Sequence, residues 1–222
     1  MKSIEEIRRE FAFMLVEGVF RGDTIELIGE SFIADEDSIF GDANEDYIQR
    51  ELAWYLKESL NVNEIPGNVP KIWQDVSAAD GSINSNYGYL LKSPGNGSQM
   101  KHVVDHLVRD PLSRRAVAIY TRPSIHTEWN HDGMSDFICT NAVNYFIRDG
   151  AVHAVVQMRS NDVVYGYRND IAWQRYALQM VQGNLALRGV EVKLGEIIWN
   201  AASLHIYSRH YHLVEKWIED QS

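Results

Sequence analysis

The residues best suited to chemistry lie close together in the chain, between positions 134 and 170. They include Cys139, the only cysteine, and Arg159. Two apolar runs, 142–147 and 152–158, are separated by an Asp-Gly pair, which predicts a β-hairpin. The hairpin would bring Cys139, before its first strand, beside Arg159, after its second. A guanidinium next to a thiol favours the thiolate, so the pair predicts a nucleophile that acts on an anionic substrate.

Other interpretations of the cysteine and the histidines are less well supported. A lone cysteine is often a small buried hydrophobic residue. A cysteine hydrolase needs a histidine within hydrogen-bond reach, and no motif places one there. His205, His210 and His212 could suggest a metal, but their spacing fits no helix or finger pattern and no acidic or sulfur ligand accompanies them. We therefore expect no metal.

Composition limits the classes of function. A net charge of −10 argues against direct nucleic-acid binding, although a few arginines can still bind one phosphate. A single cysteine excludes an internal disulfide and is typical of a reducing compartment. No segment approaches the ~20 apolar residues of a membrane span, and the N-terminal apolar run is too short for a signal peptide. We expect a soluble, cytoplasmic protein that does not bind membranes. No repeat or charge block marks a boundary, so residues 1–222 are expected to form one α+β domain.

Hydrophobic periodicity predicts the elements that would position the reactive residues. Helices are expected at 1–18, 44–60, 99–109 and 171–187, and strands at 24–28, 116–120 and within 196–207. The Gly/Ser/Asn-rich stretch 72–88 is expected to be a loop; its aromatic residues Trp73 and Tyr87 could line a site.

Several charged side chains have both a structural and a functional interpretation. Glu51 lies within the apolar pattern of the second helix; a buried carboxyl there would have a raised pKa and could transfer protons. Arg114 and Arg115 precede a strand, where they could clamp a phosphate or simply face solvent. Arg21 lies in a turn and has the same two interpretations.

Six motifs in the same order resemble the thymidylate synthase superfamily: YIQRELAWY, INSNYG, YTRPS, MSDFICTN, VVQMRSNDVVYGYRND and SLHIYSRH. Within it, they look most like the deoxycytidylate hydroxymethylases of large tailed phages, and the resemblance spans roughly residues 5–217. It implies a thymidylate synthase-like fold, in which helices flank a mixed, twisted sheet that also forms a homodimer interface. It further implies a role in making modified phage DNA precursors in the host cytoplasm.

The resemblance also implies a reaction. Cys139 matches the family's nucleophile, which adds to carbon 6 of the pyrimidine, here dCMP. Carbon 5 then takes the methylene group of the folate co-substrate, 5,10-methylenetetrahydrofolate. Addition of water would give 5-hydroxymethyl-dCMP and tetrahydrofolate, whereas a synthase reduces the methylene by hydride transfer.

Further residues match the family's substrate and folate contacts. Phosphate binding is implied for Arg159, Ser160, Arg21 and, from the neighbouring subunit, Arg114 and Arg115. Base, sugar and proton-transfer roles are implied for Glu51, Tyr87, Asn161, Asp162, His205 and Tyr207. Trp73 and Asp162 match residues that contact the folate.

Asp170 is the most informative departure from the synthases, which carry asparagine there. A carboxylate accepts a hydrogen bond from the cytosine amino group and, when protonated, donates one to the ring nitrogen. The exchange therefore favours cytosine over uracil, although an aspartate that caps the helix at 171–187 would also fit. Ile138 and Thr140 replace the proline and histidine that flank the synthase nucleophile, which supports the same branch.

Two alternatives remain open from the sequence. One is a thymidylate synthase, or a hydroxymethylase that acts on dUMP or CMP. The other is a non-catalytic nucleotide-binding protein, although the presence of Cys139, Glu51 and Asp162 together argues against it. The chain ends in IEDQS instead of the small apolar tail that closes synthase sites.

Overall fold

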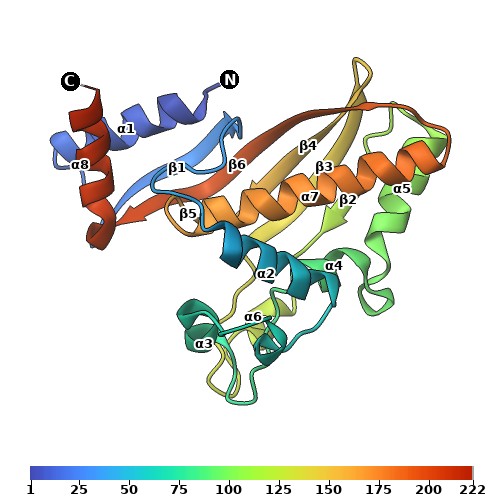
Figure 1. Cartoon of the computed structure of the whole chain (residues 1–222), viewed down its shortest axis with the longest axis horizontal. Coiled ribbons are helices and arrows are strands. Elements are labelled where there is room, and N and C mark those ends of the chain that lie inside the picture. Colours follow the sequence, from blue (N-terminus) through green and yellow to red (C-terminus); the bar gives the residue numbers. More distant parts are fainter. Residues whose placement is uncertain (222) are drawn as a thin grey trace.

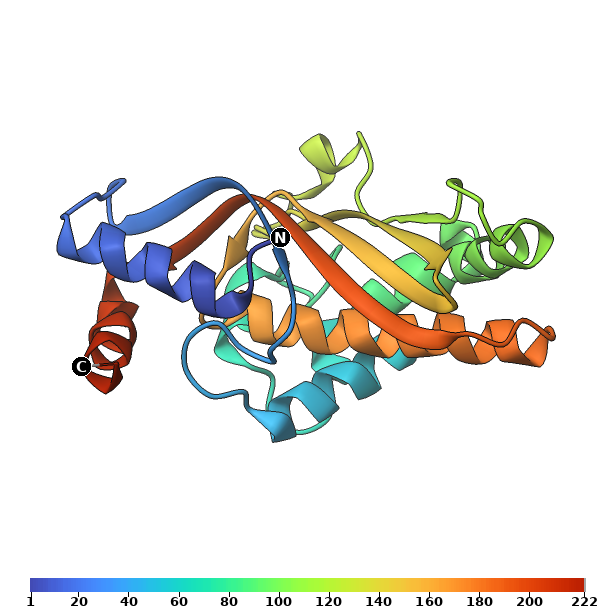
Figure 2. The same cartoon turned by 90° about the horizontal axis from the view of Figure 1, so that it is seen from above.

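The computed structural model describes residues 1–221. A six-stranded sheet forms one layer, the long helix α7 lies against one face of it, and α2 packs on the side of α7 that faces away from the sheet (Figures 1 and 2). The strands are β1 (Thr24–Ile33), β2 (Val117–Ile119), β3 (Thr140–Arg148), β4 (Ala151–Met158), β5 (Asn161–Asp162) and β6 (Lys193–Tyr207). The α-helices are α1 (Ile4–Val16), α2 (Glu45–Leu56), α3 (Lys71–Val76), α4 (Tyr87–Lys92), α5 (Gln99–Arg109), α6 (Ile125–Glu128), α7 (Gly166–Leu187) and α8 (Tyr211–Asp220). Short 3₁₀ helices cover Val62–Glu64, Pro94–Asn96 and Ser208–His210.

The sheet is mixed, as predicted. Its strand order is β1-β6-β4-β3-β2, with β5 also pairing with β6. β4 and β5 run parallel to β6, whereas the other pairs are antiparallel. Because β4 and β6 are parallel neighbours, their C-terminal ends lie at the same end of the sheet, and residues that follow the two strands can meet there.

The predicted hairpin is present. Arg148 pairs with Ala151, and Asp149 and Gly150 between them both have positive φ angles, which is the geometry of a type I′ turn. At the other end of the hairpin, Thr140 pairs with Met158. This register places the residues just before β3 and just after β4 side by side.

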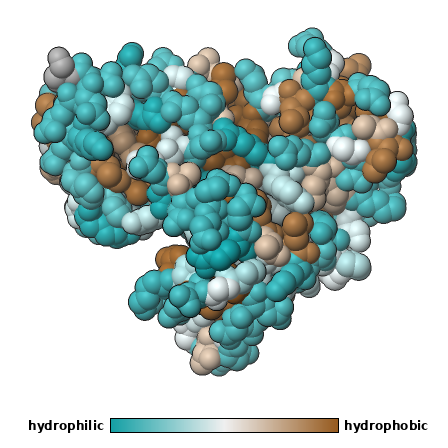
Figure 3. All heavy atoms as spheres, in the orientation of Figure 1, coloured by the Kyte–Doolittle hydropathy of each residue, from teal (hydrophilic) through white to brown (hydrophobic). Residues whose placement is uncertain are grey.

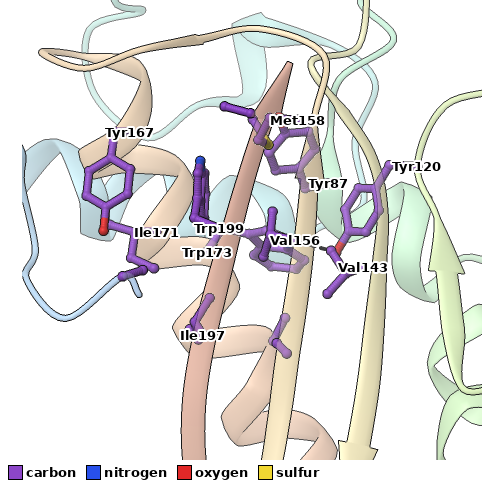
Figure 4. Close-up of a cluster of buried hydrophobic side chains, with 14 of the residues drawn as sticks. Tyr87, Tyr120, Val143, Val156, Met158, Tyr167, Ile171, Trp173, Ile197 and Trp199 are labelled. Carbon is purple, nitrogen blue, oxygen red and sulfur yellow. Dashed lines mark hydrogen bonds between the residues drawn. The ribbon is translucent and has the colours of Figure 1, made fainter. Parts of the chain in front are cut away.

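Large aromatic side chains fill the space between α7 and the sheet. The buried group in Figure 4 includes Trp173 from α7 and Trp199 from β6, both 0% exposed. The indole nitrogen of Trp173 donates a hydrogen bond to the Tyr120 hydroxyl at 3.1 Å, so its polar group is satisfied in the core. The tryptophans and tyrosines thus serve largely as core.

Helices α2 and α4 approach each other closely at Gly88. A Cβ atom there would lie 1.8 Å from the carbonyl oxygen of Tyr55, so only glycine fits. Next to this contact the rings of Tyr55 and Tyr87 stack with centroids 5.5 Å apart. The close approach therefore brings Tyr55 of α2 against Tyr87 of α4, beside the start of β3.

Several element boundaries differ from the prediction. Helix α7 begins at Gly166 and not at residue 171, because Asp162 accepts hydrogen bonds from the backbone amides of Val164 and Tyr165 and turns the chain into the helix. α2 ends at Leu56. β1 and β6 are longer than predicted, and the stretch 72–88, expected to be a loop, contains most of α3 and the start of α4.

Candidate active site

Cys139 and Arg159 lie in contact, as the hairpin predicted. The Nη2 atom of Arg159 lies 3.5 Å from the sulfur, and its Nε donates to the carbonyl of Ile138 at 3.0 Å. The guanidinium also lies over the Phe137 ring, 4.7 Å from its centroid. Cys139 is a free, partly buried thiol. The arginine is therefore held against the segment that carries the cysteine.

The sulfur is protonated in this arrangement. Burial raises the pKa of Cys139 to about 11, and the negative charges of Asp170 and Asp136 add to the rise. The positive charge of Arg159 opposes it, as predicted, but does not cancel it. At neutral pH the resting residue is thus a thiol, and its proton has to leave before it can act as a nucleophile.

Glu51 is buried in the centre of the site, with only 4% of its surface exposed. Its Oε1 accepts hydrogen bonds from the hydroxyl of Tyr47 and from Nε1 of Trp73, the latter at 3.0 Å. Burial raises the pKa of Glu51 to about 7, although both hydrogen bonds lower it. The carboxyl can therefore gain or lose a proton near neutral pH, as its burial was predicted to allow.

Tyr47 is a residue that the sequence did not single out. It lies four positions before Glu51 on α2, so the two side chains share a face of the helix. This spacing could have indicated the contact between Tyr47 and Glu51, but a tyrosine four positions from an acidic residue on a helix is too common to predict a site. Its contact with Trp73, whose Nε1 lies 2.9 Å from the hydroxyl, depends on α3 and could not be read from spacing.

Asp170 lies inside α7 and does not cap it, because the N-cap residue of that helix is Tyr165. Its Oδ2 accepts a hydrogen bond from Nδ2 of Asn161 at 2.7 Å. Burial, followed by the nearby charge of Glu51, raises the pKa of Asp170 to about 8, while hydrogen bonds with Asn161 and Tyr87 lower it. The carboxyl is therefore largely protonated at neutral pH.

Tyr87 connects the nucleophile with Asp170. It is buried at the start of α4, and its pKa is raised, first by burial and then by the charges of Asp170 and Cys139. A hydrogen bond with Thr140 opposes the rise. Cys139, Glu51, Tyr87 and Asp170 thus form one cluster, although they come from four separate parts of the chain.

The two short strands at the end of the sheet carry further predicted residues. Asp162 on β5 lies opposite His205 on β6. The rings of His205 and Tyr207 meet edge to face with centroids 5.1 Å apart, so they share a face of the strand as predicted. Burial lowers the pKa of His205, which keeps its imidazole neutral at neutral pH.

The predicted phosphate-binding arginines are not all brought together within one chain. Arg114 and Arg115 are exposed and precede Ala116, whose carbonyl accepts from the amide of Tyr145. Tyr145 lies five positions after Thr140 on β3, which corresponds to ~17 Å. Arg21 lies in an exposed turn beside Thr24, which pairs with Tyr207.

The site lies apart from the groove between α2 and α7. That groove has a volume of about 420 Å³ and is lined by Ile48, Leu52, Ile171, Arg175 and Tyr176, among others. It contains none of the predicted site residues. Hydrophilic residues cover much of the face drawn in Figure 3, with small apolar patches between them.

Two absences hold for residues 1–221. No group of three or more His, Cys, Asp or Glu side chains is arranged to hold a metal ion. Within the same residues, no helix has the length and apolar character needed to cross a membrane.

Comparisons with known proteins support the resemblance. A family model described as thymidylate synthase matches residues 43–222. The deoxycytidylate 5-hydroxymethyltransferases of Enterobacteria phages T4, T2 and T6 are each 51% identical over 222 residues, which covers 97% of this chain and 90% of the relative. The thymidylate synthase of Fusobacterium nucleatum is 30% identical over 166 residues, or 73% of this chain and 56% of the relative.

The fold is similar to that of a solved relative. Thermostable thymidylate synthase A from Bacillus subtilis superposes with a TM-score of 0.72 at 21% identity, covering 98% of this chain and 84% of that one. The predicted α+β fold with a mixed sheet and flanking helices is confirmed.

Proposed function

Because this chain belongs to the thymidylate synthase family, we propose that it is a deoxycytidylate 5-hydroxymethyltransferase that converts dCMP into 5-hydroxymethyl-dCMP. Relatives that share 51% of its sequence carry that name. The observation that carries the proposal is the protonated carboxyl of Asp170 in the same cluster as the Cys139 thiol. The product would serve as a precursor of modified phage DNA.

Base recognition follows from the hydrogen-bonding pattern of cytosine. Its 4-amino group is a donor and its ring N3 is an acceptor. A protonated carboxyl offers one acceptor oxygen and one donor hydroxyl, which matches that edge. An ionised carboxylate offers two acceptors and would face the N3 lone pair without a proton. Asp170, with its pKa raised to about 8, is in the matching form at neutral pH.

The nucleophile and the acid–base groups have separate tasks. Addition of the Cys139 sulfur to carbon 6 of the base places an electron pair at carbon 5, which makes that carbon the nucleophile for the next step. Tyr87 interacts with both Cys139 and Asp170, so its hydroxyl can take part in proton exchange at the base. Arg159 and Ser160, which follow β4, would bind the phosphate group of the nucleotide.

The one-carbon unit would come from 5,10-methylenetetrahydrofolate when it is bound. The residues present fit such a molecule: Trp73 offers a partly buried aromatic surface, and Asp162 offers a partly buried carboxylate to the amino groups of a pterin. Two contacts support this assignment: Trp73 donates a hydrogen bond to Glu51, and Asp162 lies opposite His205.

Hydroxymethylation requires a water molecule to be activated, and Glu51 is suited to that step. Both donors, Tyr47 and Trp73, bind its Oε1. In residues 1–221 no hydrogen bond to Oε2 is formed, so this oxygen can accept a proton from water. With its pKa raised to about 7, the carboxylate form is populated at neutral pH.

The active form would be a homodimer with shared sites. Arg114 and Arg115 are exposed and lie ~17 Å along the sheet from the nucleophile of their own chain, too far to reach its phosphate. Contribution to the partner's phosphate site explains their exposure. The face of β3 and β4 opposite α7 carries the partly exposed Phe146 and Val155 and would form the interface.

A substrate panel tests the proposal. Purified protein and methylenetetrahydrofolate are incubated separately with dCMP, dUMP and CMP, and the products are identified by mass. We expect a hydroxymethyl product from dCMP and release of its carbon-5 proton. A methyl product, or a preference for dUMP or CMP, would refute the assignment. The Cys139→Ser variant serves as the inactive control.

A further inference from the structure

Asn161 makes a single, well-defined contact with Asp170. It is only 3% exposed, and its Nδ2 donates to Oδ2 of Asp170 at 2.7 Å. Its own Oδ1 is buried and has no hydrogen-bond partner in the described part of the chain. The pair is tightly enclosed, since a Cβ atom at Gly166 would come within 3.1 Å of Nδ2.

The orientation of the Asn161 amide has a physical reason. If the amide were flipped, Oδ1 would accept the Asp170 proton and the buried NH₂ group would lose its acceptor. A buried N–H without a partner is rarer in proteins than an under-satisfied carbonyl. The orientation in which Nδ2 donates and Oδ1 is unpaired is therefore favoured, and it makes Oδ2 of Asp170 an acceptor.

Protonation of Asp170 does not by itself select cytosine. A neutral carboxyl has one donor and one acceptor, and it can match either base if the proton is free to move between its oxygens. Cytosine needs the acceptor opposite its 4-position and the donor opposite N3. Uracil, with an oxygen at position 4 and a hydrogen on N3, needs the reverse. Selection requires that the proton be fixed on one oxygen.

We propose that Asn161 is a positioning residue that confines the proton to Oδ1 of Asp170 and so makes the site selective for cytosine over uracil. Oδ2 would then accept from the 4-amino group as well as from Asn161, while the Oδ1 hydroxyl donates to N3. The inference rests on the proposed function, because it concerns how that same site chooses its base.

Other groups around Asp170 also shift its pKa. Titratable groups face it from α2, α4, β5 and the residue before β3: Glu51, Tyr47, Tyr55, Tyr87, Asp162 and Cys139. The charges of Glu51 and Asp162 raise the pKa of Asp170, and the hydrogen bonds from Asn161 and Tyr87 lower it. Loss of the Asn161 donor should therefore raise that pKa further.

The test is Asn161→Leu, which keeps the approximate volume but removes the donor. The ratio of kcat/KM for dCMP to that for dUMP should fall by about tenfold, the equivalent of one hydrogen bond. The pH at which kcat/KM for dCMP falls on the alkaline side should also rise, because Asp170 would keep its proton up to a higher pH. Loss of a residue with only a structural role would change neither the substrate ratio nor the pH of this alkaline fall.

Controls separate the possible failures. Asn184→Leu removes an exposed amide from α7 outside the site and should leave both readouts unchanged. If thermal melting shows that Asn161→Leu does not fold, Asn161→Ser replaces it, because a hydroxyl can donate or accept and should relax selection in the same direction. A folded variant with the wild-type ratio and the wild-type alkaline fall would overturn the inference. Absence of dCMP turnover by the wild type would instead refute the proposed function itself.

Discussion

Replacing Asp170 by asparagine should relax the choice of base towards dUMP. The neutral aspartic acid carries one proton, which cannot serve Asn161 and the base together. The amide carries two hydrogens. With the Asn161 amide flipped, one hydrogen can reach its otherwise unpaired Oδ1 while the other meets the 4-oxygen of uracil. The amide oxygen of the variant would then accept from N3–H. The variant can therefore match both polar groups on this edge of uracil, and only the NH₂ group of the flipped Asn161 is left without an acceptor.

The size of the effect follows from the two mismatches that uracil meets in the wild type. Its 4-oxygen would face the acceptor Oδ2 of Asp170, and its N3–H would face the Oδ1 hydroxyl. Each unmatched buried group costs roughly 1–3 kcal/mol, so the pair costs roughly 2–6 kcal/mol. This corresponds to about 30-fold to 10⁴-fold in kcat/KM. Asp170→Asn should therefore raise the dUMP-to-dCMP ratio of kcat/KM by at least about 30-fold.

The assay is release of the carbon-5 hydrogen from tritiated dCMP and dUMP, measured between pH 6 and pH 10. In the wild type, kcat/KM for dCMP should fall as the pH rises through about 8, since in our proposal it is the protonated form of Asp170 that binds cytosine. An amide does not ionise, so the variant should not show this fall in kcat/KM near pH 8. An unchanged substrate ratio, or a fall near pH 8 that survives the substitution, would refute the reasoning.

Three further changes probe other parts of the structure. The free energy of unfolding of Glu51→Gln, measured by denaturation relative to wild type, should rise by about 2–3 kcal/mol between pH 5 and pH 8. The pKa of Glu51 in the folded protein, about 7, exceeds its ordinary value, so the wild type loses stability as the pH rises across that interval. Gly88→Ala should lower the free energy of unfolding by about 1–3 kcal/mol, whereas Gly183→Ala, with open space, should not lower it. Equal amounts of inactive Cys139→Ser and Arg114→Ala protein, unfolded and refolded together, should recover about a quarter of wild-type turnover through mixed dimers; no recovery would contradict shared sites.

The parts of the fold that depend on local sequence could be predicted. The β3–β4 hairpin is encoded by alternating apolar residues and by Asp149-Gly150, whose positive φ angles the turn requires. Because the hairpin fixes which residues are opposite, the contact of Cys139 with Arg159 followed from the sequence as well. Helix α5 was also predicted within its observed bounds, Gln99–Arg109.

The parts that depend on particular side-chain hydrogen bonds and on burial could not be predicted. The start of α7 is determined by backbone amides that donate to Asp162, and no periodicity around Tyr165-Gly166-Tyr167 indicates it. The protonated states of Cys139 and Asp170 arise from burial between elements far apart in the chain. Local reasoning suggested a thiolate beside Arg159, because it accounts for a neighbouring charge but not for the loss of solvent.

The pairing of β1 with β6 has a consequence for how the protein is made. Thr24 lies opposite Tyr207, so an early strand must wait for one of the last segments to be synthesised. At ~5–20 residues per second, the ribosome needs about 10–40 s to bridge that interval. During this time β1 has no neighbour on its β6 side, and β4 lacks its parallel partner. Pairings of such long sequence separation form slowly. The nascent chain should therefore bring His205 of β6 opposite Asp162 of β5 only after nearly all of the sheet has been synthesised.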